Sequence, residues 1–232
     1  MKHLNGTGNL YSSGLQLLLL AGTLALQVPQ ALGYFNTKAI AGMSDHIKGT
    51  WLKLRPILSP RDLPGLFAVC HIQPSSDLRA GLPAISGYIL FHQKSPDSSL
   101  DAYFELQGFP MDDTQSERAI HVHQFGDLSG GCGSTGPHFN PFGVNHPSHP
   151  GDFHNFKVKN GKIIKHLIHL KANLFGVHTI LGRGVVVHQG KDDLGFGGNP
   201  ASLQSGNSGT RLACCTIGLS KGDLWQQMVP KE

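Results

Sequence analysis

The chain has 232 residues and a formal net charge of +4, and 39% of its residues are hydrophobic. With 30 glycines and only 15% charged residues it is typical of a turn-rich β protein, which excludes a coiled coil or a helical bundle. The apolar content argues against disorder, and the absence of a long basic run argues against a nucleic-acid partner.

The N-terminus has the pattern of a secretory signal peptide over residues 1–33. Lys2 supplies the positive charge, residues 15–26 are an apolar stretch too short to span a bilayer, and small residues follow at 31–33. We therefore expect cleavage before Tyr34, secretion into the extracellular space and no membrane partner. An uncleaved membrane anchor is the alternative.

Residues 34–64 are predicted to form a short amphipathic helix followed by a linker. Apolar side chains recur every three or four positions until Pro56 ends the pattern. These side chains are Ile40, Met43, Ile47, Trp51 and Leu54. The stripe could dock on the main domain, but pairing between copies is favoured, because one helix outside the domain has little else to bury against. We therefore expect a homo-oligomer.

Residues 65–219 are predicted to be one all-β domain, followed by a short polar tail at 220–232. The expected strands are 66–72, 85–93, 100–107, 119–125, 155–159, 162–169, 182–189 and 211–219. Asn160-Gly161 predicts a two-residue hairpin turn between the fifth and sixth strands. Short strands with glycine-rich connections favour a sandwich or a barrel. Two connections, 126–154 and 190–210, are long enough to indicate functional loops.

Four cysteines in a secreted chain predict two disulfides. Cys214 and Cys215 are neighbours on a predicted strand and point to opposite faces, so a bond between them would be strained. Each should therefore pair with Cys70 or Cys132. Spacing alone leaves both pairings open.

Histidines mark a candidate metal site. His121 and His123 occupy alternate positions of one predicted strand, so both imidazoles lie on one face, as two ligands of one metal would. The long loop that follows adds three histidines and a carboxylate, a set that suits tetrahedral zinc. These residues are His138, His146, His149 and Asp152. His188 ends a later apolar strand and could complete an all-nitrogen copper site with the first pair. A polar loop with incidental histidines is the alternative.

Five separated segments between about residues 70 and 218 resemble the copper/zinc superoxide dismutase family. They are HVHQFGD (121–127), GCGSTGPHFNP (131–141), HPGD (149–152), GRGVVVHQGKDDLGFGGN (182–199) and GNSGTRLAC (206–214). Their number and order make the resemblance specific. It implies an eight-stranded Greek-key β-barrel that converts superoxide to dioxygen and hydrogen peroxide by alternate reduction and oxidation of copper.

The resemblance also implies one copper and one zinc per subunit, with a role for each site residue. The copper ligands would be His121, His123, His138 and His188, and the zinc ligands His138, His146, His149 and Asp152. His138 would bridge the two metals and act as the catalytic general acid. Asp192 matches the carboxylate that orients a copper ligand and a zinc ligand. Arg211 matches the arginine that attracts and docks superoxide, and lysines at the channel rim could assist it. The implied disulfides are Cys132–Cys214 and Cys70–Cys215.

Within the family, the extracellular dismutases resemble the chain best, through the signal peptide, the glutamine of HVHQFGD, the doubled cysteine and GDLW at 222–225. Members of that group are usually tetramers, which implies a dimer or a tetramer here. Heparin-binding members end in a dense Arg/Lys cluster, whereas this tail has only Lys221 and Lys231, so we expect weak or no heparin or matrix binding. The alternative function is a secreted non-catalytic copper/zinc-binding relative, which would need neither Asp192 nor Arg211.

Overall fold

The structure is a computed structural model, and it describes residues 65–111 and 116–230. The predicted signal peptide (1–33) and the predicted helix and linker (34–64) lie outside the described residues, so both remain predictions. In the part of the chain that is described, no helix has the length and apolar character needed to cross a membrane.

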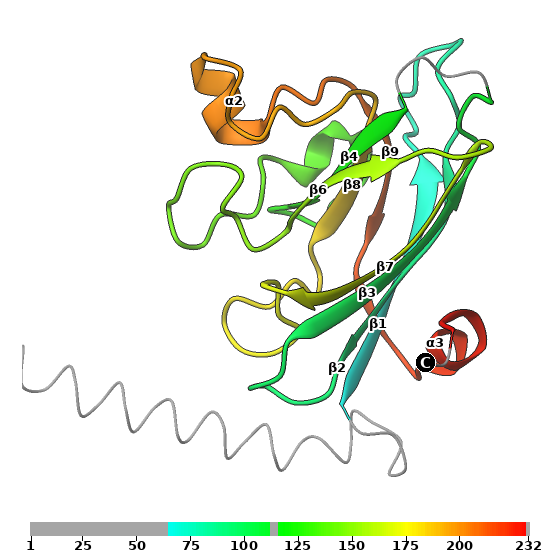
Figure 1. Cartoon of the computed structure of the whole chain (residues 1–232), viewed down its shortest axis with the longest axis vertical. Helices are drawn as coiled ribbons and strands as arrows, with labels where there is room; N and C mark the ends of the chain where they lie inside the picture. The colour runs from blue at the N-terminus through cyan, green and yellow to red at the C-terminus, as the bar shows by residue number, and fades with distance from the viewer. Residues whose placement is uncertain (1–64, 112–115, 231–232) are drawn as a thin grey trace, which may run out of the picture. The chain divides into compact units, whose positions relative to one another are not determined.

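An antiparallel sheet forms the body of the molecule. Its strands are β1 (Leu66–Pro74), β2 (Ser86–Gln93), β3 (Leu100–Gln107), β4 (Glu117–His123), β6 (Asp152–Lys157), β7 (Lys162–Leu170), β8 (Gly184–His188), β9 (Arg211–Thr216) and β10 (Gly218–Ser220), and the short strand β5 (Ser129–Cys132) lies outside this sheet. The pairing order is β6-β4-β8-β9-β1-β2-β3-β7, with β10 added on β1. Figure 1 shows these strands wrapped around a common core. The all-β, nearly closed eight-stranded barrel is therefore confirmed.

A tight hairpin connects the two ends of this strand order. Asn160 and Gly161 both have positive φ angles, 50° and 70°, as a two-residue hairpin turn requires. The backbone N–H of Lys162 donates to the carbonyl of Lys159 at 3.0 Å, and the reverse bond is 2.9 Å long. The predicted turn is confirmed, and it holds β6 and β7 together at one end of the barrel seam.

The half of the sheet around β4 and β8 is buried on both faces. Every residue of β8 is buried, and so are Arg118–His123 of β4. The two long loops explain this burial, because they lie together on one side of the barrel, where the second loop carries helix α2 (Pro200–Ser205) (Figure 1). One face of β4 therefore packs in the core, while the other lies beneath the loops.

Several element boundaries differ from the prediction because pairing decides them. The predicted strand 155–159 begins at Asp152, which pairs with His121 of β4. The predicted strand 211–219 divides in two: β9 pairs with β8 and with the end of β1, whereas β10 pairs with the start of β1. Helix η1 (Gly133–Thr135), strand β5 and helix α2 lie inside segments expected to be loops.

The C-terminal tail is not simply a polar extension, as residues 220–232 were expected to be. It forms helix α3 (Asp223–Met228). Trp225 of this helix packs on the outer face of the sheet, with ring centroids 6.3 Å from Phe67, 5.3 Å from His92 and 5.8 Å from His166. The tail is ordered because one tryptophan finds an aromatic surface on three strands.

Candidate metal centre

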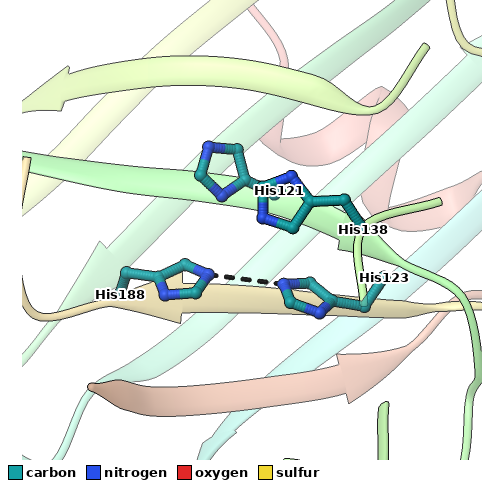
Figure 2. A group of neighbouring side chains, drawn as sticks. All are labelled: His121, His123, His138 and His188. Carbon is teal, nitrogen blue, oxygen red and sulfur yellow. Dashed lines mark hydrogen bonds between the residues drawn. The ribbon is translucent and has the colours of Figure 1, made fainter. Parts of the chain in front are cut away.

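Four imidazoles converge over the end of β4. His121 and His123 share one face of this strand, and the neighbouring strand β8 places His188 beside them. His138 comes from the loop after η1, where its backbone forms an isolated bridge with His123. Figure 2 shows the four rings gathered together, with the Nε2 atoms of His123 and His188 facing each other at 3.3 Å.

Irregular pairing places two of these side chains. The register shifts between Ala119 and His121 in the β4–β6 pair, and again between Val187 and His188 in the β8–β9 pair. A β-bulge changes the direction of the side chains next to it. Both shifts directly precede a histidine of the site.

Three groups of side chains could each hold a metal ion, because the ligand atoms within each group all lie within 4.8 Å of one another. The first contains His121, His123, His138 and His188, the second His138, His146, His149 and Asp152, and the third His121, His146 and Asp192. Every member is buried. The structure thus brings together all the residues predicted as metal ligands, and His138 belongs to both four-residue groups.

Asp152 is the centre of the second group. Its carboxylate oxygens lie 3.1 Å from His138 Nδ1, 2.9 Å from His146 Nδ1 and 3.0 Å from His149 Nδ1. Burial would raise the pKa of this carboxyl, but contacts with the three imidazoles outweigh burial and hold the pKa well below its usual range. Asp152 is therefore an anion at neutral pH, with three imidazole nitrogens around it.

Asp192 connects the two four-residue groups. One of its oxygens lies 2.9 Å from His121 Nε2 and the other 2.7 Å from His146 Nε2, and the side chain is fully buried. The backbone N–H of Leu194 also donates to this carboxylate, and the side-chain oxygen of Asn155 accepts from the Asp192 N–H. These contacts fix the carboxylate, which in turn fixes one imidazole of each group.

Each imidazole of the first group has one nitrogen engaged by the protein. His121 uses Nε2 on Asp192, and His138 uses Nδ1 on Asp152. His123 Nδ1 lies 2.8 Å from the Gly136 carbonyl, and His188 Nδ1 lies 3.3 Å from the Gly209 carbonyl. The second nitrogen of each ring is thereby left for the centre of the group.

These nitrogens provide a test of whether a metal fits. Within these groups, His121 Nδ1, His138 Nε2, His146 Nδ1 and His149 Nδ1 are buried without a hydrogen-bond partner, although the last two lie close to Asp152. Outside them, His166 Nε2 on β7 is also buried without a partner. Burying a polar atom without a partner costs free energy, and a bound cation would remove that cost. Four imidazoles suit copper, and three imidazoles with one carboxylate suit zinc. The two groups therefore fit a copper and zinc pair.

Burial also keeps the first group unprotonated. It lowers the pKa of His138 to about 4 and, with help from neighbouring imidazoles, that of His123 and His188 well below the ordinary value. His146 is the exception. Burial would lower its pKa, but the adjacent carboxylates of Asp152 and Asp192 raise it to about 9. A metal ligand must be free of its proton, so the first group is ready to bind whereas His146 must release one.

Arg211 begins β9 and places a positive charge beside the first group. Its Nη1 donates to the Cys132 carbonyl at 2.9 Å and to the Thr135 hydroxyl at 3.0 Å. Its charge is one of the causes that lower the pKa of His123 and His188. The Cys132–Cys214 disulfide joins the same loop to the same strand, so Arg211 is held by covalent and hydrogen-bonded contacts.

The cysteines pair as the family resemblance implies. Cys70 bonds to Cys215, and Cys132 bonds to Cys214. No free cysteine remains in the described part of the chain. As expected from strand geometry, the neighbours Cys214 and Cys215 bond to different partners.

A cavity of about 470 Å³ opens beside His138 and His149, next to Leu203 and Gln204 of α2. None of the described residues that line it is lysine or arginine. The rim lysines that the resemblance suggested are therefore not found in this cavity. The sequence also gave no signal for the carbonyl groups of Gly136 and Gly209, because a main-chain acceptor can belong to any residue type.

The fold and the paired ligand groups define an all-β protein with a site for two metal ions. The family model for copper/zinc superoxide dismutase (SODC) matches residues 85–217. The chain belongs to the copper/zinc superoxide dismutase family.

Relatives with known names agree with this assignment. The extracellular superoxide dismutase [Cu-Zn] of Mus musculus is 57% identical over 165 residues, which cover 71% of this chain and 66% of that protein. The Homo sapiens protein of the same name is 54% identical over 172 residues, covering 74% and 72%. The superoxide dismutase [Cu-Zn] of Talaromyces marneffei is 43% identical over 143 residues, covering 59% and 91%. The chain thus spans about two thirds of the length of the extracellular relatives it matches.

Proposed function

We propose that the protein is a secreted copper/zinc superoxide dismutase that converts superoxide to dioxygen and hydrogen peroxide in the extracellular space. The observation that carries this proposal is the sharing of His138 between a four-imidazole group and a three-imidazole, one-carboxylate group. Membership of the family and the identity of 54–57% to extracellular relatives support both the activity and the location.

Each metal has a defined set of donors in this proposal. Copper would be held by His121, His123, His138 and His188, and zinc by His138, His146, His149 and Asp152. When bound, copper supplies the one-electron redox chemistry and zinc supplies a fixed positive charge. Asp192 would orient His121 and His146 through its two oxygens, which keeps one ligand of each metal in place.

His138 is assigned the role of general acid. Its Nδ1 is fixed beside Asp152, whereas its Nε2 has no hydrogen-bond partner among the described residues. Nε2 is therefore the atom that can take up a proton and donate it to the product.

Arg211 is assigned the attraction and orientation of the substrate anion. Its Nη1 is anchored by the loop, and in the described part of the chain no hydrogen bond to another group engages its Nε or Nη2. A guanidinium fixed in this way can present its remaining donors to a small anion. Arg211→Glu should therefore slow dismutation and weaken its acceleration at low salt. Unchanged kinetics across ionic strength would exclude this role.

The decisive experiment is an assay of superoxide dismutation by the secreted full chain loaded with copper and zinc. Fast turnover that cyanide inhibits is the expected result, because cyanide binds copper. Binding of both metals without turnover would instead indicate the alternative, a secreted non-catalytic relative. The arrangement of Asp192 and Arg211 does not favour that alternative, since metal storage requires neither residue.

We also propose that the chain forms a homo-oligomer, either a dimer or a tetramer. Phe125, Leu128 and Leu219 are exposed apolar residues, and the Thr216 hydroxyl donates to the Gly126 carbonyl at 2.7 Å, which holds the Phe125 loop against the end of β9. Phe125 and Leu128, three residues apart on this loop, are taken as a candidate apolar patch for a subunit contact. Phe125→Ser should lower the mass in sedimentation equilibrium, whereas Phe196→Ser, at another exposed phenylalanine, should not. Equal masses for both variants would exclude this patch.

Matrix binding is proposed to be weak or absent. Helix α3 carries Asp223 and no basic residue. Elution from a heparin column at or below physiological salt is expected, because a few scattered charges bind weakly and are screened. Retention well above physiological salt would contradict the proposal. In that case the lysines that flank the β6–β7 turn should be replaced first; they are Lys157, Lys159, Lys162 and Lys165.

A further inference from the structure

A second, smaller cavity lies beside Arg211. Its volume is about 290 Å³, and it joins the β1–β2 connection to the start of β9. The lining residues are Asp77, Leu78, Arg79, Gly133, Thr210 and Arg211. None of the ligand groups contains a residue of the β1–β2 connection, so metal binding does not account for the residues of this loop.

Two arginines line this one cavity. Arg79 is exposed, and its Nη2 lies 3.5 Å from the hydroxyl of Thr210, the residue before Arg211. Arg211 is anchored through Nη1 to the loop that follows β5. Two like charges around a small space repel each other, and an anion between or beside them relieves that repulsion.

The acidic residue of the cavity does not cancel this charge. Asp77 accepts a hydrogen bond from the Ser75 hydroxyl, and Ser75 in turn accepts from the backbone N–H of Cys132. Asp77 is therefore hydrogen-bonded within its own loop. The lining contains one acidic residue and two arginines, so its formal charge is positive. Backbone bonds within the loop, from Leu78 N–H to the Ser75 carbonyl and from Leu82 N–H to the Arg79 carbonyl, hold Arg79 at this position.

The cavity of about 470 Å³ beside His138 differs from this one in charge. It opens beside His138, and no described residue in its lining is lysine or arginine. Helix α2, which contributes Leu203 and Gln204 to it, has the sequence PASLQS and carries no charge. Cationic side chains that could draw an anion toward the first ligand group are therefore found on the side of Arg211, where Arg79 joins it.

We propose that Arg79 is a second anion-attracting residue, which forms with Arg211 a vestibule for small inorganic anions. The substrate role rests on the proposed function, since superoxide is the anion to be collected. The binding of an anion as such does not rest on it. Arg79 acts by raising the local concentration of the anion next to Arg211, so it is a positioning residue and touches no metal ligand.

The test compares Arg79→Gln with Lys171→Gln in the full, copper- and zinc-loaded protein. Both variants lose one exposed positive charge, but Lys171 follows β7 and lines neither cavity. Inorganic phosphate is the equilibrium probe, and its affinity is measured by isothermal titration calorimetry. We expect Arg79→Gln to bind phosphate about three- to tenfold more weakly, and Lys171→Gln to bind it as the unmodified chain does.

Dismutation rates at low and high salt form the second readout. Arg79→Gln should be about two- to threefold slower at roughly 10 mM ionic strength, and the difference should vanish near 1 M, where the Debye length is about 3 Å. Arg79→Lys keeps the charge and should retain most of the salt dependence. A structural role for Arg79 would give a loss of rate that salt does not remove.

The outcomes separate this inference from the proposed function. If the unmodified chain shows no dismutation but Arg79→Gln still loses phosphate affinity, the proposed function fails and the anion site stands. If Arg79→Gln and Lys171→Gln are alike in phosphate affinity and in salt-dependent rate, the vestibule is overturned. If Arg79→Gln loses phosphate affinity but its dismutation rate is unchanged, Arg79 does not help to collect the substrate.

Discussion

Two regions of the same barrel use histidine in opposite ways. Around β4 and β8, the rings are engaged through their nitrogens, which meet Asp152, Asp192 and main-chain carbonyls. On the outer face of β1, β2 and β7, the rings are engaged mainly through their faces and edges, although His71 Nε2 also lies 3.0 Å from Gln73 Nε2. There His92 stacks on Phe67 at 4.3 Å between ring centroids, and His71 stacks on Tyr88 at 4.6 Å.

The two sets of histidines differ both in burial and in the partners of their rings. His166 on β7 is packed against Trp225, and none of the ligand groups found among the described residues includes it. His166 Nε2 and His121 Nδ1 are both buried without a hydrogen-bond partner, but only His121 lies in a ligand group, where Asp192 engages its other nitrogen. The orienting carboxylate and the neighbouring imidazoles therefore distinguish the proposed ligand from the packing residue.

Removing the ligand shared by both groups should have the largest effect on metal content and activity. His138→Ala takes one donor from each of the two four-residue groups, so we expect lower copper and zinc contents and a loss of dismutation of more than about 100-fold. Metal content by atomic absorption and the rate of superoxide loss measure these effects. His166→Ala is the control from the other region, and it should keep both metals. Normal occupancy of both metals in His138→Ala would show that the shared-ligand assignment is wrong.

Changing an orienting carboxylate should have a smaller effect. In Asp192→Asn an amide NH₂ replaces one oxygen, so either His121 or His146 loses its acceptor. We expect the affinity for the metals to fall by about 10- to 100-fold, as measured by competition with a chelator. Asp193→Asn is a matched control, because Asp193 contacts Ser202 and Asn207 in the α2 loop and no ligand. Equal metal affinities for the two variants would show that Asp192 does not orient the ligands.

The ligands could be predicted from the sequence because each depends on a side chain within a short, ordered motif. The alternation of His121 and His123 already indicates a shared face, and family resemblance supplies the residues from distant segments. The disulfide pairing is a different case. Local geometry excluded only a Cys214–Cys215 bond, and the resemblance alone decided between the remaining pairings.

Features that depend on long-range packing could not be predicted. Strand β5 is a short glycine-rich segment, SGGC, without an alternating pattern. The acceptors for His123 and His188 are carbonyl groups of glycines, which leave no mark in the sequence. The sequence of helix α3 suggests only a polar tail, because Phe67, which Trp225 contacts, is far away along the chain. In each case the missing information is a tertiary neighbour.

Trp225→Ala should have the smallest effect on metal binding and activity. It tests the region where histidines serve as packing surfaces. Trp225 is half-buried against Phe67, His92 and His166, so its loss should lower the free energy of unfolding by about 1–2 kcal/mol, less than for a fully buried tryptophan. Denaturant unfolding of the metal-loaded protein measures this change, and Trp225→Phe should restore part of it because an aromatic ring remains. Metal content and dismutation rate should stay unchanged, since α3 packs on the face whose histidines serve as aromatic surfaces. A fall in copper or zinc content would mean that the two regions are coupled through the sheet, and the separation between packing and ligand histidines would then fail.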